Sequence, residues 1–229
     1  MLYAWIGNEK RQPAIKGERA ICRDCGAELI SVLPIENVAH WRHRAGDCDS
    51  WSEPEGPWHL GWKAKFEVDE CEVAMTDGAT GERHWADVLC DAVGGRRTVL
   101  ELQHSSISDE ERIAREQFYG SQARMLWLLH VANDNNLRGS HFALTLSSSK
   151  PIEHKGKTFY RMTWFAPGRQ FIDKWKRSSA HVFLDHHGHL YYLATPFACA
   201  DLVRSFGKGE FALCPIDANE FVRIVRGFA

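Results

Sequence analysis

The chain has 229 residues, 44% of them hydrophobic, and a formal net charge of −2. These values suit one or two globular domains and argue against a disordered chain. The longest apolar stretches, such as 125–132, are shorter than the roughly 20 residues of a membrane span, and residues 1–13 lack the pattern of a signal peptide. We therefore expect a cytoplasmic protein that binds no membrane. Because the net charge is close to zero, a polyanion such as DNA would have to bind at local basic patches.

Composition divides the chain into three parts. Residues 1–50 are turn-rich and contain the motifs CRDC and HWRH, which predict a small zinc-knuckle-like module. Residues 51–150 begin with a Gly/Pro-rich connector and continue as an α/β core. Residues 151–229 are aromatic and alternate irregularly, so we expect an α+β C-terminal region packed on that core. The sequence assigns no role to this last part.

The first module carries metal-ligating side chains. Cys22 and Cys25 form a C-x-x-C knuckle, and His40, His43 and Cys48 follow within a span that can close a tetrahedral zinc site. The cysteine count is odd and no thioredoxin-like context surrounds the knuckle, which favours a metal over disulfides or redox chemistry. A closed site would fold a module too small to build a core. The alternative is unliganded cysteines in a turn-rich segment.

Basic and sulfur-containing side chains outside the ligand set have simpler interpretations. Arginines around the knuckle could contact phosphates, or could form a solvated basic loop; they are Arg19, Arg23, Arg42 and Arg44. The remaining cysteines, in apolar surroundings, are expected to be small core residues; they are Cys71, Cys90, Cys199 and Cys214. The HHGH run at 186–189 favours a polar turn over a second metal site.

The predicted core contains a helix, a hairpin, a second helix and a strand. Residues 58–70 predict a helix with Trp58, Trp62 and Phe66 on one apolar face. Residues 83–93 and 98–105 predict two strands joined by a glycine-rich loop. A helix is expected over 106–124, with Ser108 as N-cap and Glu111 closing a capping box. Residues 124–133 then predict a buried strand.

The C-terminal region gives two local predictions. Residues 181–194 predict a hairpin that turns at 186–188. Residues 219–228 predict a last strand or a short helix, and the pattern does not decide between them.

The register of the first hairpin decides whether its acids share a face. A three-residue loop at 94–96 places Asp87 opposite Gln103 with Glu101 diagonal to it, whereas a two-residue loop separates the two acids. We favour the longer loop because such loops commonly end at positive φ, which glycine reaches easily. Two such carboxylates repel unless a cation lies between them, and oxygen ligands favour Mg²⁺ or Mn²⁺. The alternative is a solvated face with salt bridges to Arg83 or Arg97.

Several short motifs occur in a characteristic order. They are A-D-V at 86–88, E-L-Q at 101–103, S-S-I-S at 105–108, R-x-x-R-x-x-x-Y at 112–119 and L-W-L-L at 126–129, preceded by E-x-x-x-H-x-x-x-K at 55–63. Together they make roughly residues 20–131 resemble the competence-protein CoiA-like family, a branch of the PD-(D/E)XK nuclease superfamily. The resemblance implies an α/β fold with a PD-(D/E)XK nuclease-like core, in which helices flank a mixed central sheet.

The resemblance also implies catalytic roles. Asp87 and Glu101 match the metal-binding acids, and Gln103 occupies the position where many superfamily members carry lysine. An amide can only hydrogen-bond, so Lys63 could supply the missing charge. In this mechanism Asp87 and Glu101 hold Mg²⁺ or Mn²⁺, water activated by the metal attacks phosphorus, and Lys63 with Gln103 orients it.

Two further matched residues each have alternative roles. Glu55 would add a third carboxylate or position a water, although PEGPWH is less helical than the family's usual segment. His59 would contact a metal-bound water or a phosphate, or would only pack and cap its helix. The resemblance also selects the zinc ligands as Cys22, Cys25, His43 and Cys48, with His40 as the substitute.

Arg112, Arg115 and Tyr119 lie on one side of the predicted second helix. With Arg42 and Arg44 they are our candidates for contacting DNA. They could instead brace the metal site, or Glu111 could simply pair with Arg115 on an exposed face. The sequence thus predicts a metal-dependent deoxyribonuclease that acts on DNA and can form a homo-oligomer. A non-catalytic recombination loader on a nuclease-like fold and a toxin or phage-defence effector are the alternatives.

Overall fold

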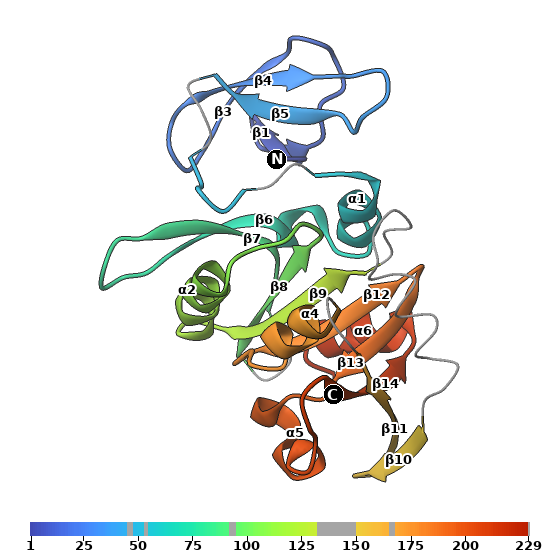
Figure 1. Ribbon diagram of the computed structural model, residues 1–229. Helices are drawn as coiled ribbons and strands as arrows, with labels where there is room; N and C mark the ends of the chain where they lie inside the picture. Colours follow the sequence, from blue (N-terminus) through green and yellow to red (C-terminus); the bar gives the residue numbers. More distant parts are fainter. Residues whose placement is uncertain (45–47, 53–54, 92–94, 132–149, 165–167, 229) are drawn as a thin grey trace. The chain divides into compact units, whose positions relative to one another are not determined.

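The computed structural model describes residues 1–44, 48–52, 55–91, 95–131, 150–164 and 168–228 (Figure 1). The chain divides into two compact units, Met1–Cys90 and Asp91–Ala229. The division into three parts at residues 50 and 150 stays a prediction. No helix within the described ranges has the length and apolar character needed to cross a bilayer.

The first unit begins with two small antiparallel sheets. One pairs β1 (Ala4–Ile6) with β2 (Glu9–Arg11), and the other has the order β3 (Arg19–Ile21), β4 (Glu28–Val32) and β5 (His40–His43). Side chains alternate across these strands, so Ala20, Leu29 and Trp41 are buried and pack with Ala4 and Cys22. The segment therefore has a small apolar cluster of its own beside its cysteines.

The same unit continues with a short helix and a hairpin: α1 (Pro57–Lys63), η1 (Val68–Glu70), β6 (Cys71–Thr76) and β7 (Arg83–Asp91). The predicted helix over 58–70 is thus too long. It ends at Lys63 because Lys65 and Phe66 donate three residues back, to the Trp62 and Lys63 carbonyls, which tightens the chain into a turn. Of the predicted apolar face, Trp62 and Phe66 are buried and Trp58 is half-buried.

Strand β7 shows the alternation that positions its acid. It pairs antiparallel with β6, with Val73 opposite Ala86. Ala86 and Val88 are buried on one face, whereas Asp87 lies on the other face and is half-buried.

The second unit is built on a large mixed sheet whose neighbouring strands run in the order β10–β11–β14–β13–β12–β9–β8. The strands are β8 (Arg97–Gln103), β9 (Arg124–His130), β10 (Lys150–His154), β11 (Lys157–Thr163), β12 (His181–His186), β13 (His189–Leu193) and β14 (Glu210–Ile216). Strands β8, β9 and β12 are parallel and the other pairs are antiparallel. The strands predicted at 98–105 and 124–133 are confirmed as β8 and β9.

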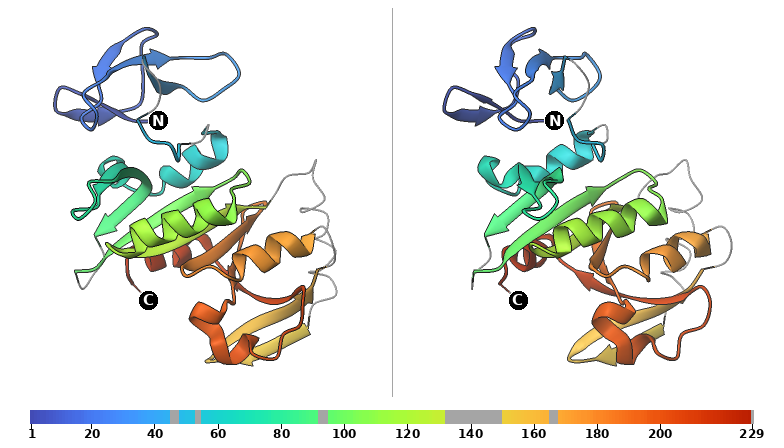
Figure 2. Two further views of the ribbon diagram at one scale, coloured as in Figure 1. Left: turned by 60° about the vertical axis from the view of Figure 1, so that its left-hand side comes forward. Right: turned by 90° about the vertical axis from the view of Figure 1, so that its left-hand side faces the viewer.

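Helices flank this sheet (Figure 2). They are α2 (Asp109–Gly120), α4 (Gly168–Trp175), α5 (Pro196–Val203) and α6 (Ala218–Val225). Ser108 caps α2 as predicted, because its hydroxyl oxygen accepts a hydrogen bond from the Glu111 N–H at 3.0 Å. The sequence did not decide between a strand and a helix for residues 219–228, and most of this region lies in α6.

The predicted C-terminal hairpin is confirmed by β12 and β13, in which His186 pairs with His189. His187 and Gly188 form the turn, and both have positive φ. A mixed α/β fold with a large mixed sheet flanked by helices is therefore confirmed, and its assignment to the PD-(D/E)XK class stays a prediction.

Candidate metal and acidic sites

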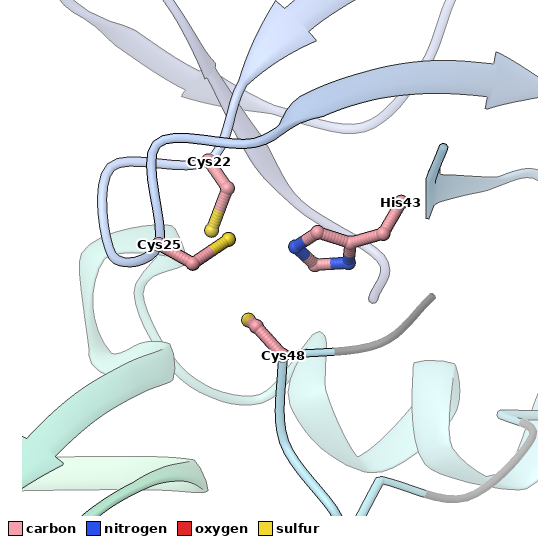
Figure 3. A group of neighbouring side chains, drawn as sticks. All are labelled: Cys22, Cys25, His43 and Cys48. Carbon is pink, nitrogen blue, oxygen red and sulfur yellow. The ribbon is translucent and has the colours of Figure 1, made fainter. Parts of the chain in front are cut away.

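A cysteine and histidine cluster forms at the N-terminal module. Cys22 and Cys25 belong to the turn after β3, His43 ends β5, and Cys48 lies in the segment that follows. Their ligand atoms all lie within 4.8 Å of one another, and Figure 3 shows the four side chains pointing toward a common centre. Three thiols and one imidazole are a donor set that fits Zn²⁺. His40 is outside this group, and its Nδ1 lies 3.0 Å from the Val38 carbonyl oxygen.

The cysteines of this cluster are free thiols. Burial, and after it the neighbouring Cys22 and Cys25 thiols, raise the pKa of Cys48 to about 12. A thiol must lose its proton to bind a metal. The protein environment without a cation thus disfavours the thiolate, and a bound cation would have to supply that stabilisation.

A second polar cluster surrounds the Lys63 ammonium, which has no exposed surface. Its Nζ lies 2.7 Å from Glu55 Oε2, 3.0 Å from Asp87 Oδ1 and 3.2 Å from Glu72 Oε1. Lys63 is the last residue of α1, Glu72 is in β6 and Asp87 is in β7. The structure thus brings together three residues that the sequence predicted for one site and adds Glu72, which it did not predict. We call these four residues the acidic cluster.

Glu72 is held from several directions. Besides Lys63, it accepts hydrogen bonds from the Leu2 N–H at 2.5 Å and the Tyr3 N–H at 2.9 Å. Its backbone has φ of +48°, uncommon for a residue with a side chain. Burial alone would raise the pKa of Glu72, but Lys63, a hydrogen bond with Glu55 and the Leu2 amide lower it below its usual value. The only feature of the sequence that could have indicated a role for Glu72 is its position as a carboxylate within the apolar run at 71–75.

The charge states of Lys63 and Glu55 follow from this crowding. Burial disfavours the Lys63 ammonium, but Glu72, Asp87 and Glu55 together raise its pKa well above the usual value, so the lysine stays charged. Burial also raises the pKa of Glu55 well above its usual value, and the charge of Glu72 adds to that effect. Glu55 is therefore the acid of the cluster that keeps a proton most readily.

His59 lies at the first turn of α1 and is buried. Its Nδ1 accepts a hydrogen bond from the Gly56 N–H at 3.3 Å, and its ring meets Trp58 edge-on with centroids 5.1 Å apart. These contacts match the packing and capping alternative. A contact with a phosphate or a metal-bound water stays a prediction.

The second unit contains the other predicted acid. Glu101 Oε2 lies 3.3 Å from Arg115 NH1, and the side chain of Glu101 is only 4% exposed. Arg115 also contacts Glu111 at 2.5 Å. Gln103 Nε2 donates to the Ser105 carbonyl oxygen at 3.2 Å. Because Asp87 belongs to the first unit and Glu101 to the second, their shared cation and the predicted register stay predictions.

The face of α2 that carries Arg112, Arg115 and Tyr119 is buried. Arg112 contacts Glu116 at 2.8 Å. The alternative that Glu111 pairs with Arg115 on an exposed face is met only in part. The pair exists and Glu111 is 33% exposed, but Arg115 is buried and also contacts Glu101. Of the two functional alternatives, these contacts fit bracing better than direct contact with DNA.

The remaining candidates are on the surface or in the core. Arg42 is exposed in β5, and Arg19 and Arg44 both pair with Glu28, at 2.7 and 2.8 Å. Arg83 pairs with Asp24 rather than with Asp87. The four other cysteines are buried, as predicted. Within the described ranges, the Cys/His cluster is the group of three or more side chains whose ligand atoms lie close enough together to share one metal ion, and the 186–189 turn forms no such group.

Comparison with known proteins identifies part of the chain. Residues 80–186 match the family model described as "Competence protein CoiA, nuclease-like domain". The match confirms the resemblance and includes Asp87, Glu101 and Gln103. It begins later and ends later than the range expected from the motifs, so the Cys/His cluster and α1 lie outside it. Neither the curated proteins nor the solved structures gave a match to this chain.

Proposed function

We infer from the match of residues 80–186 to the CoiA nuclease-like domain that this protein is a metal-dependent nuclease that hydrolyses DNA phosphodiester bonds, on a PD-(D/E)XK-like core. The observation that carries this proposal is the position of Asp87 within the matched region, 3.0 Å from a fully buried lysine. An acid beside a fixed cation is the kind of site at which charge on a phosphate can be stabilised.

The proposed ligands of the catalytic cation are Asp87 and Glu101, as expected from the sequence. Both offer carboxylate oxygens, which suit Mg²⁺ or Mn²⁺. When bound, such an ion lowers the pKa of water and offsets the charge that develops on phosphorus oxygens. The side chain of Asp87 is 24% exposed, so a ligand can approach it from solvent.

The other residues have roles that follow from their contacts. Lys63 keeps its charge and is held beside Asp87, so it can orient that carboxylate and, through its positive charge, help to stabilise a phosphate or an attacking water bound there. Glu55 can position a water, because its carboxylate is partly exposed and contacts the same ammonium. Gln103 orients through hydrogen bonds only. Arg112 and Arg115 brace the network around Glu101.

We assign structural zinc to Cys22, Cys25, His43 and Cys48, which leave no open position for catalysis. Exposed arginines of this module, Arg42 and Arg44, would contact the DNA backbone. Such contacts carry no sequence information, so this part of the protein would add affinity without selecting a site.

A second candidate function is a non-catalytic nucleic-acid-binding loader on a nuclease-like fold. One observation favours it: each proposed metal ligand already has a cationic partner, Lys63 for Asp87 and Arg115 for Glu101. Acids neutralised in this way could serve folding alone.

The deciding experiment incubates the full chain with plasmid, linear and single-stranded DNA in Mg²⁺, Mn²⁺ or EDTA. We expect cleavage with either metal, none in EDTA, and none from Asp87→Asn or Glu101→Gln. Asp91→Asn, an exposed acid at the end of β7, is the matched control and should cleave normally. If the wild type is as inert as the variants while DNA binding persists, the loader is the better interpretation.

A further inference from the structure

Two buried acids outside the proposed metal site connect the Cys/His module to the strands of the acidic cluster. Asp49 directly follows the zinc-ligand candidate Cys48, and Glu72 lies in β6. Both accept backbone N–H groups from residues far away in the sequence. A buried carboxylate with such partners fixes the backbone that it contacts, because leaving a charged acceptor unsatisfied is costly.

Asp49 holds the beginning of β7. Its Oδ2 accepts the Trp85 N–H at 2.8 Å, and its Oδ1 lies 2.8 Å from His84 Nδ1. The same Oδ1 accepts the Trp51 N–H at 2.9 Å, and the Trp51 ring stacks on His84. The segment that begins at Cys48 is therefore fastened to β7 two residues before Asp87.

The knuckle makes a second contact with the same strand. Asp24 lies between Cys22 and Cys25, and its carboxylate is 2.8 Å from Arg83 NH1. Arg83 also donates to the Asp24 carbonyl oxygen at 2.6 Å. At both ends of the proposed ligand set, a neighbouring acid thus contacts residues 83–85: Asp24 within the knuckle and Asp49 after Cys48.

Glu72 connects the module to β6 and to Lys63. The N–H groups that it accepts belong to Leu2 and Tyr3, which lead into β1. Ala4 in β1 packs in the apolar cluster that contains Cys22. Lys10, next to this cluster in β2, also donates to the backbone carbonyl oxygens of Cys71 and Glu72.

We propose that the Cys/His module positions the acidic cluster: metal loading at Cys22, Cys25, His43 and Cys48 orders residues 83–88, and with them Asp87, through Asp49. In this role Asp49 and Glu72 are positioning residues, which act through β7 and Lys63. The importance of Asp87 rests on the proposed function, but the coupling itself is a property of the fold and can be tested without DNA.

The test is hydrogen–deuterium exchange of the full chain, read by mass spectrometry. The chain is compared after loading with ZnCl₂, after treatment with a chelator, and after Zn²⁺ is added back. We expect chelation to accelerate amide exchange across 83–88 by about tenfold, the size expected for losing a hydrogen bond to a charged acceptor. Strands β12 and β13 should not change, and added Zn²⁺ should restore protection.

Asp49→Asn separates metal binding from coupling. This variant should still bind one Zn²⁺ per chain, measured by mass spectrometry under native conditions, yet show fast exchange across 83–88 even when loaded. Asp69→Asn removes the same charge at an exposed position of the first unit and should behave as wild type.

Four outcomes would overturn the proposal: no Zn²⁺ bound, exchange that rises only within residues 1–48, an equal rise in β12 and β13, or an Asp49→Asn variant that matches wild type. Failure of the proposed function is distinct, because a chain that cleaves no DNA can still show zinc-dependent protection of 83–88. In such a chain, zinc would still order residues 83–88, but this ordering would not serve catalysis.

Discussion

Each unit buries a cationic side chain among carboxylates, but the two clusters differ in the number of acids around the cation and in the exposure of those acids to solvent. In the first unit, Lys63 faces Glu55, Glu72 and Asp87, and the side chains of Glu55 and Asp87 are 14% and 24% exposed. In the second, Arg115 lies between Glu101, which is 4% exposed, and Glu111, which is 33% exposed. Three acids around one ammonium leave an excess of negative charge that suits an incoming cation, whereas two acids around one guanidinium are closer to balance and suit support. The difference points to the first cluster as the place where a ligand enters.

The largest loss of stability should come from removing the cationic side chain that has the most acidic partners. Lys63→Met leaves three carboxylates together in a buried site, so we expect a loss of about 4 kcal/mol in the free energy of unfolding. Chemical denaturation measures it. Lys16→Met, at an exposed position of the same unit, should change stability by less than about 0.5 kcal/mol. A loss no larger than that of the control would mean that the cluster is not formed as described.

Removing the buried cationic side chain of the second unit should cost slightly less stability. Arg115→Met leaves two acids rather than three, and we expect a loss of about 3 kcal/mol by the same measurement. Arg177→Met removes an exposed ion pair with Asp109 and should cost below about 1 kcal/mol. If Arg115→Met is as mild as Arg177→Met, the network around Glu101 does not support the fold as inferred.

Metal binding should distinguish the two clusters directly. We expect Mn²⁺ at a hundredfold excess over its dissociation constant to stabilise the wild type by about 2.7 kcal/mol, measured as a shift of the unfolding midpoint. Asp87→Asn should abolish the shift. Glu111→Gln, which alters only the second cluster, should retain it. A shift that survives Asp87→Asn would place the cation elsewhere.

The smallest change in stability is expected from a substitution of Glu55. Its pKa in the folded protein is raised above the usual 4.5, so the folded state binds the proton more tightly than the unfolded chain and loses stability as pH rises from 4.5 through the folded value. Glu55→Gln cannot lose that proton, so its stability at pH 7 should lie within about 1 kcal/mol of wild type, or above it. Its unfolding should also depend less on pH in this range. Glu9→Gln, exposed in β2, should keep the wild-type profile.

Local patterns predicted the elements whose residues carry their own signals. Ser108 marks the start of α2, the apolar run at 125–129 marks β9, and the His187–Gly188 turn closes its hairpin. The Cys/His cluster could also be predicted, because the spacing of its cysteines and histidines suits a zinc site and the family resemblance selected His43 over His40. Strands β10, β11 and β14 gave no such signal. The burial of β10 and β11 does not alternate regularly although they form a local hairpin, and β14 pairs with β11, which lies far away in the sequence.

The sequence could not predict contacts that only tertiary structure creates. Glu72 enters the acidic cluster through an unusual backbone conformation and through amides of Leu2 and Tyr3, about seventy residues away. Arg112 and Arg115 have the spacing of an exposed, salt-bridged helix face, and only the position of α2 against the sheet buries them. Charged residues are seldom buried, so pattern alone favours the wrong environment for both arginines.

The complete burial of Lys63 has a practical consequence for chemical footprinting. An amine-reactive reagent that modifies surface lysines cannot reach a side chain with no exposed area while the three acids enclose it. Modification at this position would therefore report the fraction of molecules in which the enclosure has opened. A single peptide, followed by mass spectrometry, could track that opening across metals, substrates and variants without any engineered label.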